Sequence, residues 1–99
     1  MKTLTQLKKD LQKAKSLTML YNGYLSFNKS NHLIGIERKI EKIQSEKIGL
    51  ATIDHNGGKC ISWFYLPRAS MLEYDGDTFT IYRLEEDIKK ISLTYRINY

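Results

Sequence analysis

Three short glycine-containing turn signals divide this 99-residue chain and constrain its fold more than any other feature. Asn22-Gly23 lies between LTMLY and YLSF, Asn56-Gly57-Gly58 between IGLATI and KCISWFYL, and Asp75-Gly76 between MLEY and TFTIY. Such dipeptides adopt the turn conformations that match the twist of paired antiparallel strands. Three of them in so short a chain predict an antiparallel meander over about residues 17–83.

The amino-terminal segment has the pattern of an amphipathic helix over about residues 4–15. Thr3 followed by Gln6 fits a capping box, and apolar side chains recur behind it at helical spacing. These apolar residues are Leu4, Leu7, Leu11 and Ala14. At roughly 100° per residue, Lys2, Lys9 and Lys13 share the outward face. That face either solvates the protein or contacts phosphates.

Residues 33–44 fit two structures. Ile36, Ile40 and Ile43 have helical spacing, whereas Ile34, Ile36 and Ile40 alternate as in a strand. We favour a strand, because it would pair with IGLATI across the short SEK turn and continue the meander.

The last residues, ISLTYRINY, alternate between apolar and polar side chains, so residues 91–98 predict a half-buried terminal strand. Its apolar face would hold Ile91, Leu93, Tyr95, Ile97 and Tyr99. Before it, three acids followed by Lys89 and Lys90 favour a short helical turn over about residues 85–90. A terminal strand at the sheet edge would also offer a route to a homo-oligomer.

One helix and five to seven strands predict a single domain, residues 1–99. The fold class is α+β, with the amino-terminal amphipathic helix packed on a curled antiparallel β-meander or small open barrel.

Composition excludes several classes of protein. No apolar run reaches the roughly 20 residues of a membrane-spanning helix, and the amino terminus lacks the apolar centre of a secretory signal. We therefore expect a cytoplasmic protein with no membrane partner. Cys60 is the only cysteine, and neither His32 nor His55 has a second ligand at a metal-binding spacing. We expect no metal and no cofactor.

The chain also lacks the motifs of catalysis. It contains no glycine-rich phosphate loop, no nucleophile elbow and no histidine with an evident carboxylate partner. Glu73, Asp75 and Asp77 gather at a turn, but they do not form the ligand series of a calcium loop. We expect a binding protein and not an enzyme.

Positive charge is concentrated in the first half of the chain. Residues 1–47 carry ten Lys and Arg against four acids, and residues 48–99 carry six against seven. This asymmetry favours an acidic partner, either a nucleic acid or an acidic protein surface. The candidate nucleic-acid-binding residues are Lys2, Lys9, Lys13, Arg38, Lys42 and Arg68. Arg68 follows the only proline, Pro67, whose fixed backbone would hold it at the end of a strand.

The segment 59–66 carries three adjacent aromatics, Trp63, Phe64 and Tyr65, on one predicted strand. Trp63 and Tyr65 would point to one face and Phe64 to the other. Exposed rings beside cations are typical of proteins that stack single-stranded bases. All three rings are therefore candidates for base stacking or partner contact, although they could instead fill both sides of a covered sheet.

The segments RKIEKIQSEKIGL, SWFYLPRAS and LEYDGDTFTIY resemble small proteins carried by phages and chromosomal cassettes of staphylococci and related bacteria. The resemblance covers roughly residues 36–83 and concerns strands and turns. It implies a mobile genetic element that replicates, recombines or evades host defence. Some proteins of this setting partner a family A DNA polymerase.

Two functions follow as expectations. The first is a protein that binds single-stranded DNA or another nucleic acid and docks on a polymerase or other replication protein. The second is a small inhibitor of a host defence nuclease, of the anti-CRISPR or anti-restriction type, that acts by protein binding. The net charge of +5 argues against DNA mimicry in the second case.

Overall fold

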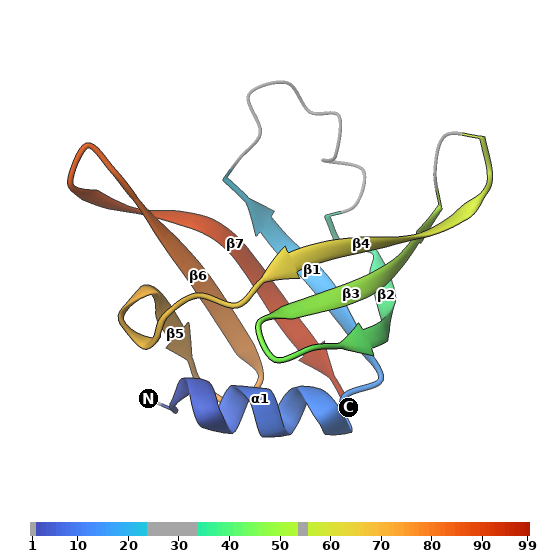
Figure 1. The fold of residues 1–99 in the computed structure, drawn as a ribbon, viewed down its shortest axis with the longest axis horizontal. Helices are drawn as coiled ribbons and strands as arrows, with labels where there is room; N and C mark the ends of the chain where they lie inside the picture. The colour runs from blue at the N-terminus through green and yellow to red at the C-terminus, as the bar shows by residue number, and fades with distance from the viewer. Residues whose placement is uncertain (1, 24–33, 54–55) are drawn as a thin grey trace.

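The computed structural model describes residues 2–23, 34–53 and 56–99, which form one helix packed on a seven-stranded antiparallel sheet (Figure 1). The elements are α1 (Leu4–Lys13), β1 (Ser16–Asn22), β2 (Glu37–Ile43), β3 (Lys47–Ile53), β4 (Lys59–Tyr65), the 3-10 turn η2 (Ala69–Met71), β5 (Leu72–Tyr74), β6 (Thr78–Glu85) and β7 (Ile88–Asn98). The predicted α+β class and the curled, open antiparallel sheet are confirmed.

The helix begins as predicted and ends two residues earlier than predicted. The Thr3 side chain accepts a hydrogen bond from the Gln6 amide at 3.1 Å, which caps the first turn. At the other end, Lys15 has left the helix, because its amide donates to the Asn98 carbonyl of β7 at 2.8 Å. Leu7 and Leu11 are fully buried, so the predicted apolar stripe faces the sheet.

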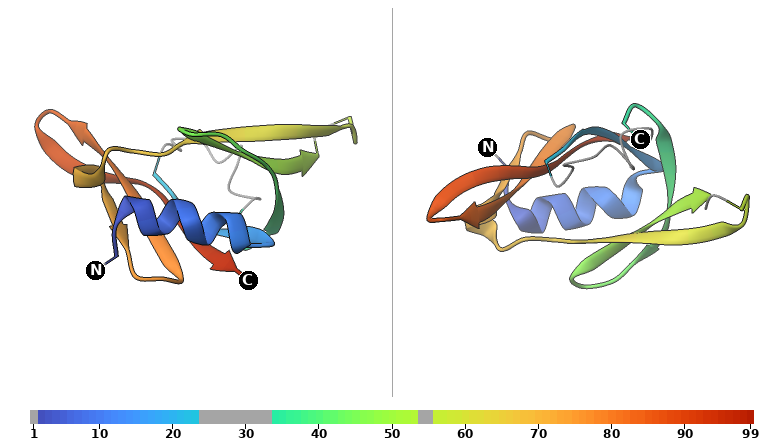
Figure 2. Two further views of the ribbon diagram at one scale, coloured as in Figure 1. Left: turned by 60° about the horizontal axis from the view of Figure 1, so that its bottom comes forward. Right: turned by 90° about the horizontal axis from the view of Figure 1, so that it is seen from above.

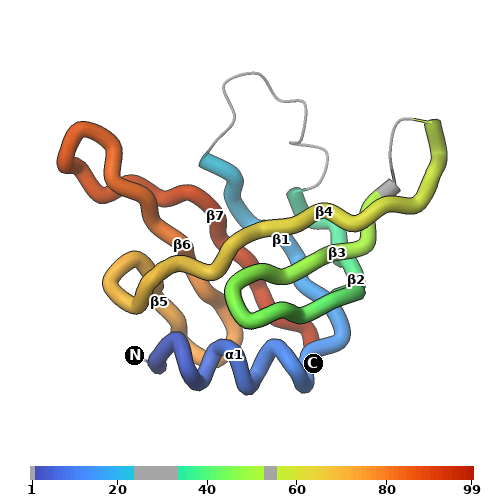
Figure 3. Tube along the Cα trace, in the orientation of Figure 1, coloured from blue at the N-terminus to red at the C-terminus, as the bar shows by residue number. Residues whose placement is uncertain are grey.

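The strands follow the order β4-β3-β2-β1-β7-β6-β5. Two meanders, β1–β4 and β5–β7, therefore meet where β1 pairs with β7. The prediction of one uninterrupted meander is wrong at a single step, because β4 and β5 are the two edges of the sheet and do not pair. Seen from above, α1 lies between the β3–β4 side and the β6–β7 side of the curled sheet (Figure 2). Both chain ends lie near α1 (Figure 3).

The carboxyl-terminal strand is interior, which corrects two predictions. β7 pairs with β1 on one side and with β6 on the other, so it offers no free edge through which a homo-oligomer could form. The predicted helical turn over residues 85–90 is also absent. β6 runs to Glu85, β7 starts at Ile88, and Glu86 and Asp87 form a two-residue turn with φ of 53° and 62°. Positive φ at both central residues is the hairpin conformation that matches strand twist.

A bulge shifts the side-chain alternation predicted for β7. The register changes between Ile81 and Tyr82, which face Leu93 and Ile91, so Ser92 has no counterpart in β6. As a result Ser92 is fully buried and Ile91 is 40% exposed, whereas Tyr95 and Ile97 face the core as predicted.

The other strand predictions hold where the structure describes them. The ambiguous segment is a strand, β2, and it pairs with β3 across the short turn after Gln44. β3 and β4 form the hairpin predicted around Asn56-Gly57-Gly58, and β5 and β6 form the one at Asp75-Gly76. The hairpin expected after Asn22-Gly23, together with His32 and His55, lies outside the described residues.

Three stacked rings form the centre of the core and join the two meanders. Tyr95 of β7 lies 4.9 Å from Phe64 of β4 and 5.5 Å from Phe79 of β6, measured between ring centroids. Leu7 and Leu11 of α1 belong to the same cluster. The curl of the sheet is thus filled by side chains from both of its halves.

A tyrosine pair anchors α1 to the end of the sheet. The Tyr74 hydroxyl of β5 donates to the Asp10 carboxylate of α1, and the Tyr99 hydroxyl donates to the Gly76 carbonyl at 2.9 Å. The two hydroxyls lie 3.3 Å apart. Burial and the Asp10 carboxylate raise the pKa of Tyr74 far above its ordinary value, so this hydroxyl stays protonated and keeps donating.

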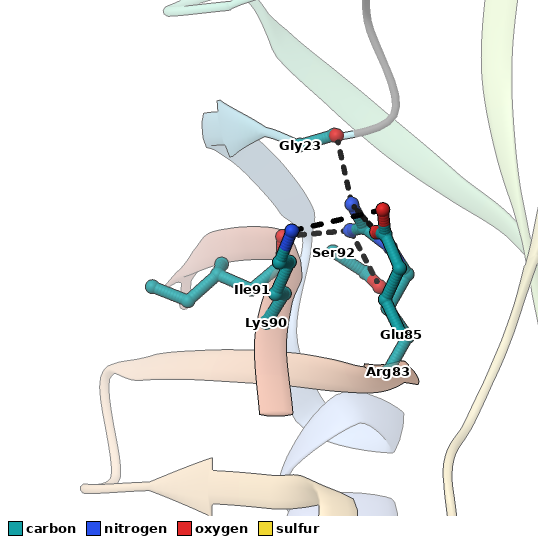
Figure 4. A network of polar contacts seen from close by, with 6 residues as sticks. All are labelled: Gly23, Arg83, Glu85, Lys90, Ile91 and Ser92. Atoms are coloured by element: carbon teal, nitrogen blue, oxygen red, sulfur yellow. Dashed lines mark hydrogen bonds and ion pairs between the residues drawn. The ribbon is translucent and has the colours of Figure 1, made fainter. Parts of the chain in front are cut away.

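At the end of the sheet away from the tyrosine pair, Arg83 of β6 connects β7 and the residue that follows β1 (Figure 4). Its guanidinium donates to the carbonyls of Ile91 and Gly23 at 2.9 and 3.3 Å and forms an ion pair with Glu85 at 3.1 Å. A Cβ on Gly23 would lie 2.1 Å from the Ile91 carbonyl oxygen, so only glycine allows this close approach. These contacts give Arg83 a structural role.

Candidate nucleic-acid interface

Two of the three adjacent aromatics of β4 lie on the outside of the sheet. Trp63 is 36% exposed and Tyr65 is 67% exposed, whereas Phe64 between them is only 7% exposed and belongs to the core cluster. Alternation along the strand explains the split, because neighbouring side chains of a strand point to opposite faces. Phe64 therefore cannot stack on a base while the domain is folded, and Trp63 and Tyr65 can.

A glycine on the neighbouring strand determines how Trp63 lies. Gly49 of β3 is the register partner of Trp63, and a Cβ there would be 3.1 Å from the indole ring and 2.6 Å from Ile61. The indole therefore lies across the bare backbone of β3. This contact holds the ring against the sheet and limits the freedom that a bound partner would have to remove.

A lysine completes this surface. The Lys47 ammonium lies 4.4 Å from the Trp63 ring centroid and 5.9 Å from that of Tyr65. Both distances are within the range of cation–π attraction. We call Lys47, Trp63 and Tyr65 the aromatic face. It combines two flat apolar surfaces and one positive charge on β4, an edge strand of the sheet, and its neighbour β3.

The predicted cations are distributed over several parts of the molecule. Lys9 and Lys13 are exposed on α1, and the Lys2 amide donates to Tyr74 of β5, at the sheet edge opposite β4. Lys42 is exposed on β2 and is the register partner of Gly49, which pairs with Trp63 on its other side. Arg68 is exposed immediately before η2.

Of these cations, Lys42 lies at a register position next to the aromatic face. The three lysines of the helical segment belong to a separate surface.

Arg38 is buried and not on the outer surface, so the prediction that it contacts the phosphate backbone of a nucleic acid is wrong. It is 6% exposed on β2, and its Nη2 lies 3.4 Å from the Tyr95 hydroxyl. The sequence ERKIEKI has charged residues at both alternating positions, so its pattern could not reveal which of them points inward.

Sequence reasoning missed Lys47 and Gly49. Counting outward from Asn56-Gly57 as a two-residue turn pairs Gly49 with Phe64 and Lys47 with Leu66, whereas the observed register pairs Gly49 with Trp63 and Lys47 with Tyr65. The register is displaced by one residue from that count, and such a shift changes which side chains lie side by side, so the turn signal alone did not reveal these two residues.

Comparison of the chain with protein-family models, with curated proteins and with solved structures gives no match. Within residues 2–23, 34–53 and 56–99, no three side chains of the metal-ligating types come together. The helix found in the same residues lacks the length and hydropathy needed to cross a membrane.

Proposed function

We propose that this chain binds single-stranded nucleic acid through the aromatic face, as an accessory protein of a mobile genetic element that docks on a replication enzyme. The observation that carries the proposal is the exposure of Trp63 and Tyr65 on one side of an edge strand, with Lys47 within cation–π distance of both rings. Flat rings accept any base, and the cation attracts the phosphate backbone. Such a role belongs in the cytoplasm.

The net charge of +5 supports the same proposal, since a positive field attracts a polyanion. Lys42, next to Gly49 in the register, adds a second cation beside the rings. Each stacked base is worth about 1–3 kcal/mol, so two rings suffice for measurable binding when phosphate contacts add to them.

A second candidate function is the inhibition of a host defence nuclease by protein binding. It is favoured by the position of β4 at the sheet edge, because an edge strand can accept a strand from another protein. The two functions use the same part of the molecule and differ in the partner.

The test uses the fluorescence of Trp63, which is the only tryptophan of the chain. Single-stranded DNA is titrated into the protein across a salt series, and fluorescence anisotropy of a labelled oligonucleotide is recorded in parallel. We expect quenching of Trp63 and an affinity that falls with salt, by about 0.7 in log–log slope for each neutralised phosphate. The absence of both signals at about 20 mM salt would contradict the proposal.

Matched variants separate the rings from general effects of mutation. Trp63→Leu and Tyr65→Leu should each weaken binding by about 5-fold to 150-fold, because they remove a stacking surface and keep an apolar side chain. Tyr82→Leu is the control, since Lys89 lies 4.4 Å over the Tyr82 ring in the same kind of pair on β6 and β7. Equal losses in all three variants would argue against the aromatic face.

A further inference from the structure

A cleft opens where β2 and β3 stop pairing. Their ladder begins at Ile40 and Leu50, so Glu37–Lys39 pairs with β1 and not with β3, and the end of β3 beyond Leu50 pairs with β4 and not with β2. The space between the diverging strands is about 820 Å³, which is in the range of small-molecule sites. Ile36 and Arg38 line one wall, and Ala51 and Ile61 line the other.

Arg38 contributes a buried positive charge to this cleft. The side chain is 94% buried, and its Nε and Nη1 have no hydrogen-bond partner among the described residues. The hydrogen bond from Nη2 to the Tyr95 hydroxyl is long at 3.4 Å. A guanidinium has five N–H donors in a planar fork, so most of its bonding capacity is unused.

No acidic group of the described residues neutralises this charge. The ion pairs found there are Arg83–Glu85 and Lys90–Glu85, and the neighbouring Glu37 accepts a hydrogen bond from Ser16 instead. Burial raises the pKa of Tyr95, with the Arg38 charge opposing that rise, so Tyr95 remains a neutral phenol. A buried charge with no counter-charge is costly, and proteins normally pair such a group or neutralise it with a ligand.

We propose that the cleft between β2 and β3 binds a small ligand through an oxyanion, phosphate or carboxylate, which accepts hydrogen bonds from Arg38. The planar guanidinium fork binds an oxyanion strongly, because its hydrogen bonds are charge-assisted and paired. Lys39 and Lys59 add positive charge to the lining, and Glu37 and Glu41 add two opposing charges, so the lining remains net positive. Ile36, Ala51 and Ile61 suit an apolar ligand body.

The experiment titrates the protein with sodium phosphate and, separately, with sodium benzoate, while sodium chloride keeps the ionic strength constant. The readout is the Nε–H signal of Arg38 in a heteronuclear NMR spectrum. We expect this signal to move saturably with at least one of the two anions, and the responding anion distinguishes a phosphate ligand from a carboxylate ligand. No movement with either anion overturns the proposal.

Thermal unfolding of variants gives an independent measurement. At ten times its Kd, the responding anion should raise Tm by roughly 6–11 °C in the wild type and in Arg96→Met, a control at an exposed arginine of β7. The rise should vanish in Arg38→Met, and an equal rise there overturns the proposal. If Arg38→Met does not fold, the wild-type NMR titration decides.

Trp63→Leu should keep the full response to the anion, because Trp63 does not line the cleft. If nucleic acid does not bind at the aromatic face, the proposed anion site therefore still stands. If no anion binds in the cleft, the proposed nucleic-acid binding still stands.

Discussion

At the scale of single residues, Trp63, Phe64 and Tyr65 have different roles although they are adjacent. Phe64 is 7% exposed and stacks on Tyr95, so Phe64→Ala would leave a cavity between the two halves of the sheet. We expect it to lower the free energy of unfolding by about 3–5 kcal/mol. Tyr65→Ala should change it by less than about 1 kcal/mol, because the ring is mostly in solvent. Urea unfolding measures both, and equal losses would contradict the assignment of faces.

The Asp10 carboxyl makes the free energy of unfolding depend on pH in the acid range. The hydroxyl of Tyr74 is the main reason that the pKa of the Asp10 carboxyl lies below its ordinary 3.8. Because this pKa is lower in the folded state, the folded protein binds fewer protons. The stabilisation is therefore complete well above the unfolded value, and it is lost as pH falls through the folded value.

We expect Asp10→Asn to be less stable than the wild type near pH 7, since the amide accepts the Tyr74 bond without a charge. The difference should shrink as pH falls toward about 2. Urea midpoints across this pH range measure it, with Asp77→Asn as a control for removing an exposed acid from the turn after Tyr74. A difference that stays constant with pH would exclude Asp10 as the titrating group.

At the scale of elements, the β6–β7 turn holds the only non-glycine residues with positive φ in the described part of the chain. Glu86 and Asp87 both adopt positive φ, which costs a residue with a Cβ roughly 1–2 kcal/mol. Asn-Gly occupies the same conformation with less strain. The double substitution Glu86→Asn with Asp87→Gly should therefore stabilise the protein by about 1 kcal/mol in urea unfolding. An unchanged or lower free energy of unfolding would show that the Glu86 and Asp87 side chains stabilise the turn by at least as much as their positive φ destabilises it.

The same turn shows how far sequence reasoning could reach for an element. Hairpins marked by glycine, such as β3–β4 and β5–β6, were predictable because glycine adopts the positive φ of such turns without a steric cost, as Gly57 and Gly76 do. The turn at Glu86-Asp87 contains no glycine, and its acids followed by Lys89 and Lys90 also suit a short helix. The bulge at Ser92 was equally hidden, since a bulge leaves the residue pattern intact and only changes which side chains face inward.

At the scale of the whole molecule, the fold class was predictable and the strand order was not. Pairing of β1 with β7 joins residues about 80 positions apart, such as Ser16 and Asn98, and no local pattern specifies it. The burial of Arg38 is a consequence of that arrangement, because β2 closes against β1 there and separates from β3. The cleft thus depends on long-range pairing, whereas the aromatic face lies on the local β3–β4 hairpin. Alternation placed Trp63 and Phe64 on opposite faces of β4, but it did not show which face is exposed.

This strand order predicts that the two halves of the sheet differ in stability. The β2–β3–β4 half joins the rest through the short ladder between Ser16–Thr18 and Glu37–Lys39, whereas β7 pairs along most of its length with β6 and β1. In the core, Phe64 connects the halves by stacking on Tyr95 and Phe79. The β2–β3–β4 half should therefore open at a lower free energy than the β1–β7–β6 half.

Native-state hydrogen exchange measures this directly, with Leu50 reporting on β3 and Ile97 on β7. Both amides lie in strands paired on two sides, so they differ in the half to which they belong and not in edge position. We expect Leu50 to exchange faster than Ile97, and Phe64→Leu to accelerate Leu50 by the larger factor, because the substitution weakens the contact that holds the halves together. Equal acceleration of both amides would mean that the sheet opens as one cooperative unit, and the aromatic face and the cleft would then be no more mobile than the core.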